Sequence, residues 1–278
     1  MSIAGSVSKS AMDAGEKGYG TFQIFTANAR SWKSVTVDKS EGEKFFKYSK
    51  KYDSIPFAHA PYICNPSSPK QDVWDKSMEL LIRNMENCKI LGIKSIVVHM
   101  GSNVGSGRGS GIERIIEFSK RVMQATGSIR MLFENSSGYT NSMGSSFKEI
   151  AEIIDGISSR NIGVCLDTCH AFAAGYDMRT EAGIKKVFGE IESGIGMDKI
   201  GLIHLNDAKF ALGSGLDRHW HIGKGFIGKE GFVRLFKSGY LDGKCLIMET
   251  PENSEGDDNS NEHELLRIMR SAGYKDIR

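Results

Sequence analysis

Short apolar runs alternate with longer amphipathic segments along the chain. The short runs predict β-strands at 21–25, 56–60, 95–100, 131–135, 162–166, 200–206 and 245–250. Apolar residues at helical spacing predict helices over 7–17, 45–52, 69–91 and 180–192, after a glycine-rich loop at 101–111, after a capping box at Ser146 and Glu149, and around 265–272. This alternation is typical of a parallel sheet with crossover helices.

Polar side chains gather where these strands end. The carboxyl ends of parallel strands carry the active site in a (β/α)8 barrel and the ligand crevice in an open sheet. Seven strands in a chain of 278 residues favour an α/β fold, a (β/α)8 TIM barrel that is short of its first strand. No linker of foreign composition and no internal repeat interrupts the pattern, so we expect a single domain over 1–278.

Composition limits the classes of function. A net charge of +2 does not indicate a nucleic-acid-binding surface, so any site for a polyanion must be local. The sequence shows no apolar run of about 18 residues and no signal peptide, which predicts a cytoplasmic protein without a membrane partner. The five cysteines are an odd number and widely spaced, which favours reduced core thiols over a disulfide framework.

The segment 162–177, IGVCLDTCHAFAAGYD, is the most informative stretch. A buried strand is followed by Asp167 and His170, where we expect a loop. Ionisable groups at such a position are costly unless they are paired, ligating or catalytic. Similar groups occur at the ends of other strands, and the candidates together are His59, His99, Glu134, Asp167, His170, His204, Asp217, His219 and Glu249.

Each candidate has an ordinary structural explanation when it is taken alone. A histidine in an apolar run is commonly a hydrogen-bonded core residue, and a buried glutamate can pair with an arginine. Gathered at one end of a barrel, these ionisable groups would be costly in free energy to bury unless a metal cluster bound them. Nine donors exceed the three protein ligands of a catalytic zinc, so they suit three metals with one bridging carboxylate. Such a site is locally cationic, can bind phosphate and suits in-line phosphoryl displacement.

At these residues the sequence resembles the endonuclease IV family of apurinic/apyrimidinic (AP) endonucleases, which are trinuclear-zinc TIM barrels that repair abasic DNA. The resemblance covers essentially the whole chain. The motifs that carry it are FTANARSW (25–32), HAPY (59–62), VHMGS (98–102), FEN (133–135), VCLDTCHAFAAGYD (164–177), HLNDAK (204–209), DRH (217–219) and ET (249–250).

The resemblance implies the ligands of three zinc ions. By this resemblance, the first ion is bound by His59, His99 and Glu134. Glu134 is also similar to the family's bridging carboxylate, which shares the second ion with Asp167, His204 and Glu249. By the same resemblance, the third ion is bound by His170, Asp217 and His219.

The family hydrolyses the phosphodiester 5′ to an abasic site in duplex DNA, leaving a 3′-hydroxyl and a 5′-deoxyribose phosphate. A metal-bridging hydroxide is the nucleophile, beside the residue that corresponds to Glu134, and no organic cofactor is used. Arg30, Tyr62 and Ile63 match residues that the family inserts into the DNA base stack. A flat cation, an aromatic ring and an apolar wedge can kink a duplex and fill its gap. We also expect the protein to be a monomer.

One departure from the family lies at the start of the sequence. The family places a strand and a histidine ahead of a V-S-x-A-G segment. Here residues 2–5 already match the end of that segment, and Met1 stands about where its valine would be. Either the true start codon lies upstream or the barrel is open at this position. The cost of an unpaired sheet edge favours an upstream start.

Two other functions fit parts of the pattern. A metal-dependent sugar isomerase or epimerase shares this type of barrel, but such sites hold one or two metals, mainly through carboxylates. The His170, Asp217 and His219 triplet and the Arg30 loop argue against it. A DNA-lesion binder without catalysis is the second alternative. The G-x-G-x-x-G match at 223–228 follows a loop rather than opening a βαβ unit, so we do not predict a dinucleotide site.

Overall fold

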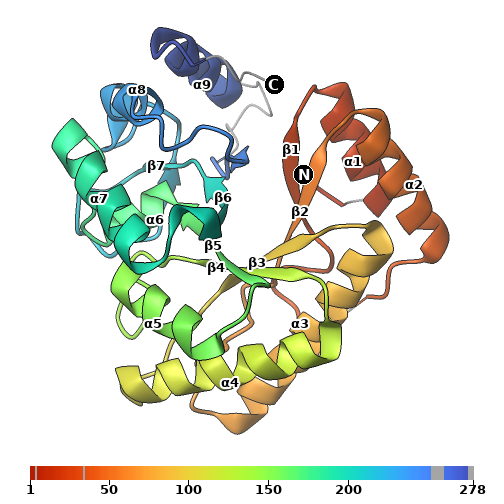
Figure 1. Cartoon of the computed structure of the whole chain (residues 1–278). Coiled ribbons are helices and arrows are strands. Elements are labelled where there is room, and N and C mark those ends of the chain that lie inside the picture. The colour runs from red at the N-terminus through yellow and green to blue at the C-terminus, as the bar shows by residue number, and fades with distance from the viewer. Residues whose placement is uncertain (4, 34, 252–259, 275–278) are drawn as a thin grey trace. The chain divides into compact units, whose positions relative to one another are not determined.

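The computed structural model describes residues 1–3, 5–33, 35–251 and 260–274. These described residues divide into two compact units, the first within 1–134 and 152–164 and the second within 135–151 and 165–274. Strands and helices alternate in both units (Figure 1), and the seven parallel-sheet strands expected from the sequence are all present. The single domain over 1–278 stays a prediction.

The first unit contains β1 (Thr21–Phe25), β2 (Ile55–His59), β3 (Ser95–His99) and β4 (Arg130–Glu134), which are neighbours in that order and parallel. The start of β5 (Ile162–Asp167) follows β4 in the sheet. The strand register places Phe25 opposite His59 and His99 opposite Glu134. The polar side chains at these strand ends therefore share one edge of the sheet.

Four helices of the first unit pack in chain order: α1 (Val7–Glu16), α2 (Lys39–Lys51), α3 (Gln71–Leu91) and α4 (Arg108–Thr126) (Figure 1). The predicted starts of two of them are wrong. Helix α2 begins at Lys39 rather than at 45, because Asp38 caps a charged first turn that shows no apolar period. Helix α4 begins inside the predicted loop 101–111, because packing of the buried Ile112 and Ile115 extends the helix over the glycines before them.

Ahead of β1, the described residues form helix α1 and no strand, in agreement with the expectation from the sequence. The Met1 ammonium group donates a hydrogen bond to the carbonyl oxygen of Gln23 in β1, at 2.7 Å.

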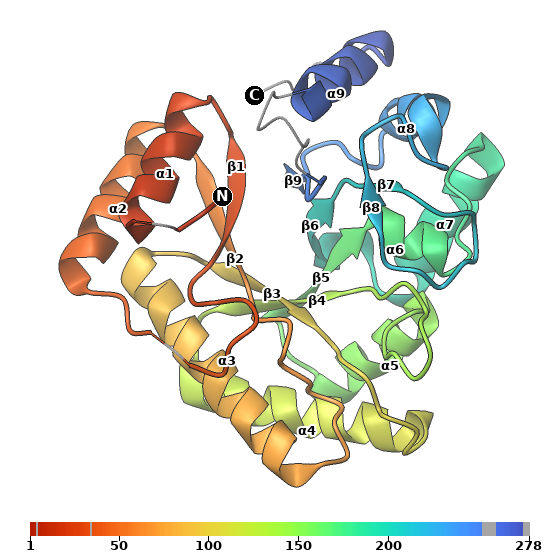
Figure 2. The ribbon, with the colours of Figure 1, turned by 180° about the vertical axis from the view of Figure 1, so that it is seen from behind.

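The second unit contains the end of β5, followed in the sheet by β6 (Ile200–His204) and β9 (Leu246–Ile247). A separate antiparallel ribbon pairs β7 (Asp207–Ala208) with β8 (His219–Trp220), and β7 packs against α6 (Thr168–Ala173) (Figure 2). The strand predicted at 245–250 is too long, because only Leu246–Ile247 form β9. The ribbon was not predicted, because two-residue strands carry no alternating pattern.

The remaining helices are α7 (Glu181–Gly194), the 3-10 turn η1 (Met197–Lys199), α8 (Gly228–Lys237) and α9 (Ser260–Ser271), while α5 (Phe147–Ile157) begins in the second unit and ends in the first. The loop predicted after 166 is wrong, since β5 continues through Asp167 directly into α6. Asp167 caps this short helix by accepting a hydrogen bond from the backbone amide of His170, at 2.7 Å. Helix α8 was not predicted, because glycines interrupt its apolar period.

None of the described helices is both long enough and apolar enough to cross a bilayer. All five cysteines are free thiols, and four of them are buried, as the sequence predicts.

Candidate metal centre

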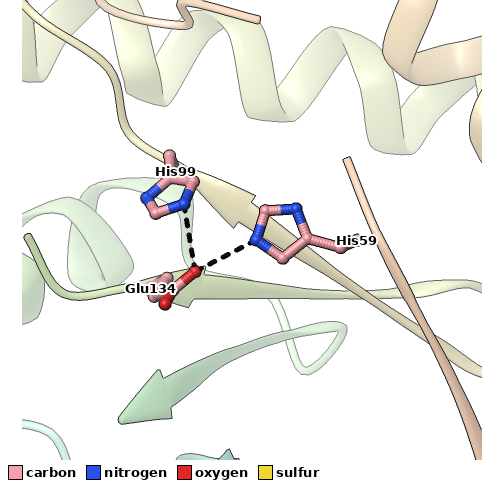
Figure 3. Close-up of side chains that lie close together, drawn as sticks. All are labelled: His59, His99 and Glu134. Carbon is pink, nitrogen blue, oxygen red and sulfur yellow. Dashed lines mark hydrogen bonds and ion pairs between the residues drawn. The ribbon is translucent and has the colours of Figure 1, made fainter. Parts of the chain in front are cut away.

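Three side chains converge at the ends of β2, β3 and β4 in the first unit (Figure 3). Glu134 Oε2 lies 3.2 Å from His59 Nε2 and 3.3 Å from His99 Nε2. Both Glu134 and His59 are 1% exposed. A carboxylate removed from water to this extent needs a positive partner.

The orientation of His59 is fixed by the backbone. Its Nδ1 lies 2.6 Å from the carbonyl oxygen of Ala60 and donates to it, because a carbonyl can only accept. In the neutral ring Nε2 then carries a lone pair that points at Glu134. A lone pair facing a carboxylate is repulsive, and a cation between the two atoms relieves the repulsion.

A second group in the second unit joins His170 on α6, Asp217 in the loop before β8, and His219 on β8. His170 Nε2 lies 3.1 Å from Asp217 Oδ1 and 3.4 Å from His219 Nε2. The Nδ1 atoms of the two histidines donate to the carbonyl oxygens of Asn135 and Glu249, each at 3.0 Å. In the neutral rings two Nε2 lone pairs therefore face each other beside a carboxylate, which again favours a bound cation.

A third group brings together side chains from the ends of β5 and β6 and from beyond β9. His204 Nδ1 lies 3.1 Å from Glu249 Oε2 and 3.9 Å from Asp167 Oδ2. His204 and Asp167 are fully buried. Within each of the three groups the possible ligand atoms lie within 4.8 Å of one another. Imidazole nitrogens and carboxylate oxygens in such groups match the donor preferences of zinc.

The nine side chains that the sequence singled out thus occur in these three groups. Cys169 also lies within 4.8 Å of Asp167 and His219, although the sequence analysis did not treat it as a ligand. Burial, then Asp167 and Asp217, raise the pKa of this thiol above its ordinary value. The protonated thiol donates a weak hydrogen bond to the carbonyl oxygen of Arg218, at 3.5 Å.

The three residues predicted to enter DNA lie on neighbouring loops of the first unit. The backbone amide of Tyr62 donates to the carbonyl oxygen of Ala29, at 2.9 Å, which ties the loop after β2 to the loop that carries Arg30. Arg30 and Tyr62 are exposed, and Ile63 is half-buried. The Tyr62 ring also contacts His59, with 5.2 Å between ring centroids. These side chains are therefore accessible beside the first group.

Two buried asparagines were missed in the sequence analysis. Asn135 directly follows β4, Asn206 lies two residues beyond the end of β6, and each binds Asp167. Asn135 Oδ1 accepts from the Asp167 backbone amide at 2.7 Å, and Asn206 Nδ2 donates to Asp167 Oδ2 at 2.6 Å. Their position after a ligand candidate in FEN and HLN was the available signal, but the partner of an amide cannot be read from sequence alone.

Known proteins are similar to this chain over nearly its full length. The family model of xylose isomerase-like TIM barrels matches residues 13–272, which confirms the predicted barrel fold. A probable endonuclease 4 of Nitrosopumilus maritimus is 40% identical over 265 residues, covering 94% of this chain and 95% of the relative. The crystal structure of endonuclease IV from Thermus thermophilus has a TM-score of 0.86 and 32% identity, covering 97% of each chain. A D-tagatose 3-epimerase-like protein shares the fold, with a TM-score of 0.68 and 20% identity over 92% of this chain and 90% of that chain.

Proposed function

The chain belongs to the endonuclease IV family of AP endonucleases, which have the xylose isomerase-like TIM barrel fold, and on this premise we propose that it incises duplex DNA at abasic sites in DNA repair. The reaction hydrolyses the phosphodiester 5′ to the abasic site and leaves a 3′-hydroxyl and a 5′-deoxyribose phosphate. The cofactor is a set of three zinc ions.

The observation that supports this proposal most directly is that nine imidazole and carboxylate side chains fall into three groups, within each of which the possible ligand atoms lie within 4.8 Å of one another. His59, His99 and Glu134 would hold one ion, Asp167, His204 and Glu249 a second, and His170, Asp217 and His219 a third. The sharing of Glu134 with the second ion is implied by the family resemblance. When bound, zinc ions polarise a phosphate oxygen and supply a nucleophilic water at neutral pH.

The chain's own contribution is to hold and orient the donor atoms. The carbonyl oxygens of Ala60, Asn135 and Glu249 keep the Nδ1 proton on three histidines, so their Nε2 atoms face the site. Burial of Glu134 and Asp167 removes competing water and strengthens their attraction for cations. A cation-loaded site then attracts the DNA phosphate although the chain's net charge is only +2.

Recognition of the damaged strand is assigned to the loops that carry Arg30, Tyr62 and Ile63. The exposed guanidinium group and aromatic ring can stack on bases or fill the gap left by a missing base. The Tyr62 ring contacts both His59 and His99, with centroids 5.2 and 5.9 Å apart. A side chain inserted into DNA from this position would lie beside the first metal group.

The test is incubation of the full chain with a duplex that carries one tetrahydrofuran abasic analogue, together with elemental analysis of bound metal. We expect a single nick on the 5′ side of the analogue and about three zinc ions per chain, as the family ligand set implies. Chelation should abolish nicking and added zinc should restore it. A zinc-loaded protein that leaves the duplex intact would overturn the proposal.

The same experiment separates the two alternatives. A sugar isomerase or epimerase, favoured only by the shared fold, would bind one or two metals and would not nick the duplex. A lesion binder would form a tight complex with the tetrahydrofuran duplex without cutting it.

A further inference from the structure

Asn206 connects two of the three metal groups, although it belongs to none of them. It lies two residues beyond the end of β6 and is fully buried. Its side-chain Nδ2 donates to Asp167 Oδ2 at 2.6 Å, and its Oδ1 accepts from the backbone amide of Glu249 at 2.7 Å. Both polar atoms of this side chain therefore bind a residue that is itself a ligand candidate.

The backbone of Asn206 is itself fixed. Its amide donates to Thr168 Oγ1 at 2.9 Å, and the Thr168 hydroxyl donates back to the Asn206 carbonyl oxygen at 2.7 Å. Thr168 directly follows Asp167, so this pair of hydrogen bonds ties the end of β6 to the start of α6. The Asn206 amide group thus acts from a rigid position.

The consequence for Asp167 is a fixed carboxylate. Its Oδ1 accepts from the His170 amide at 2.7 Å and its Oδ2 accepts from Asn206. One hydrogen bond to each oxygen sets the plane of the carboxylate and leaves a lone pair on each oxygen for a cation. Without the Asn206 donor, rotation about the Asp167 side chain would be opposed on one oxygen only.

The consequence for Glu249 extends to a second group. The Glu249 carbonyl oxygen accepts from His219 Nδ1 at 3.0 Å. Asn206, by holding the Glu249 amide, therefore steadies the peptide segment that orients His219. One buried side chain acts on Asp167 directly, on Glu249 directly, and on His219 through Glu249.

We propose that Asn206 is a positioning residue for the metal centre, which holds Asp167 and the Glu249 backbone in the geometry that zinc requires. This inference rests on the proposed zinc-dependent function of the same groups. Loss of such an outer partner weakens metal affinity by about 10- to 100-fold in comparable sites.

A purely structural role for a buried asparagine is exemplified within the same chain. Asn87 on α3 is 2% exposed, donates through Nδ2 to the Val35 carbonyl oxygen at 2.7 Å, and accepts at Oδ1 from the Val37 amide at 2.9 Å. It thus holds the single backbone segment 35–37 through the same two side-chain atoms that Asn206 uses. Because neither of its two bonded partners is a ligand candidate, Asn87 is a matched control.

The experiment compares wild type, Asn206→Leu and Asn87→Leu as full-length proteins. Zinc affinity is measured by competition with a chelator, and thermal unfolding is measured in excess EDTA. We expect both variants to unfold at lower temperature than wild type in EDTA. Only Asn206→Leu should bind zinc about 10- to 100-fold more weakly. If Asn206→Leu does not fold, Asn206→Ser keeps a polar atom in the site and should show the same direction of change.

An Asn206 variant that folds and keeps wild-type zinc affinity would reduce the residue to a structural role and overturn this inference alone. An equal loss of zinc affinity in Asn87→Leu would do the same, because the loss would then follow from general destabilisation. A wild-type protein that neither binds zinc nor nicks abasic DNA would instead overturn the proposed function together with the inference.

Discussion

At the scale of single residues, Glu134 is the side chain on which the first metal group depends. Its Oε2 is the common partner of His59 Nε2 and His99 Nε2, at 3.2 and 3.3 Å. Glu134→Gln keeps the shape of the side chain but removes the charge that attracts the cation. We expect nicking of the tetrahydrofuran duplex to fall by at least about 100-fold, with reduced zinc content and an unchanged circular dichroism spectrum.

The control for that substitution is another buried glutamate. Glu149 is 7% exposed, and its Oε1 accepts a hydrogen bond from the backbone amide of Gly144, which is not a ligand candidate. Glu149→Gln should alter stability and leave zinc content at the wild-type value. Undiminished turnover in Glu134→Gln would remove Glu134 from the catalytic site.

Arg30 permits a prediction that separates DNA binding from metal binding. The side chain is exposed on a loop tied to that of Tyr62, and it belongs to none of the metal groups. Arg30→Ala should weaken binding to abasic duplex by about 10-fold, the size expected for one lost arginine contact, while zinc content stays constant. Binding is measured by fluorescence anisotropy, with Arg121→Ala on the exposed face of α4 as the matched arginine control. Loss of zinc from Arg30→Ala would contradict the role assigned to it.

At the scale of elements, strands were the easiest to predict. The runs at β3 and β6 are largely apolar because their central residues are buried on both faces, and this requirement is visible in the sequence. Helix α6 was missed because its capping residue, Asp167, also reads as a strand-end ligand. The β7–β8 ribbon depends on a pairing between Asp207 and Trp220 that is distant in sequence. Elements stabilised mainly by tertiary partners leave little local pattern.

The contact between α1 and α2 gives a prediction for the pH dependence of stability. Glu41 on α2 accepts from Lys44 Nζ at 3.0 Å and from the Ser8 hydroxyl on α1 at 2.8 Å. These two partners, Lys44 first, lower the pKa of Glu41 from 4.5 to about 2. The folded state therefore favours the carboxylate, and the resulting stabilisation is complete above pH 4.5 and is lost as the pH falls to about 2.

Glu41→Gln should accordingly lower the free energy of unfolding at pH 7 by about 1 kcal/mol, a value limited by partial solvent exposure. The difference from wild type should shrink as the pH falls below 4.5. This difference in the free energy of unfolding is measured by urea unfolding of wild type and Glu41→Gln in EDTA. Glu43→Gln is the control, because it removes the same charge from the same helix. A difference that is constant from pH 7 to pH 3 would show that the carboxylate charge is not its source.

At the scale of the whole molecule, the candidate site was more predictable than the network that supports it. Six of the nine ligand candidates could be found because histidine, aspartate and glutamate are rare at the ends of buried strands. The other three, His170, Asp217 and His219, were found as local pairs with a neighbouring candidate and through the family resemblance. Asn135 and Asn206 could not be assigned, because an amide after a strand is equally compatible with a turn. The backbone carbonyl acceptors of His59, His170 and His219 carry no sequence signature at all. Their identity follows only from the folded positions of Ala60, Asn135 and Glu249.

Metal removal tests whether these buried groups depend on a cation for stability. Without one, the Nε2 atoms of His170 and His219 face each other at 3.4 Å, and the side chains of Glu134 and Asp167 are almost fully buried. Zinc that binds the folded state alone adds about 2.7 kcal/mol per site at a hundredfold excess over its dissociation constant. For a chain of this size that corresponds to an increase of roughly 5–10 °C in Tm for one site.

We therefore expect EDTA to lower Tm by at least roughly 5 °C and added Zn²⁺ to restore it, as measured by calorimetry. The His170→Ala variant is the appropriate control, because it loses one ligand and relieves one pair of facing lone pairs. Its Tm should respond less to EDTA than that of the wild type, whereas its Tm in EDTA should equal or exceed the wild-type value. A wild-type Tm that is identical with and without chelator would mean that the three groups are stable as packed side chains and need no metal.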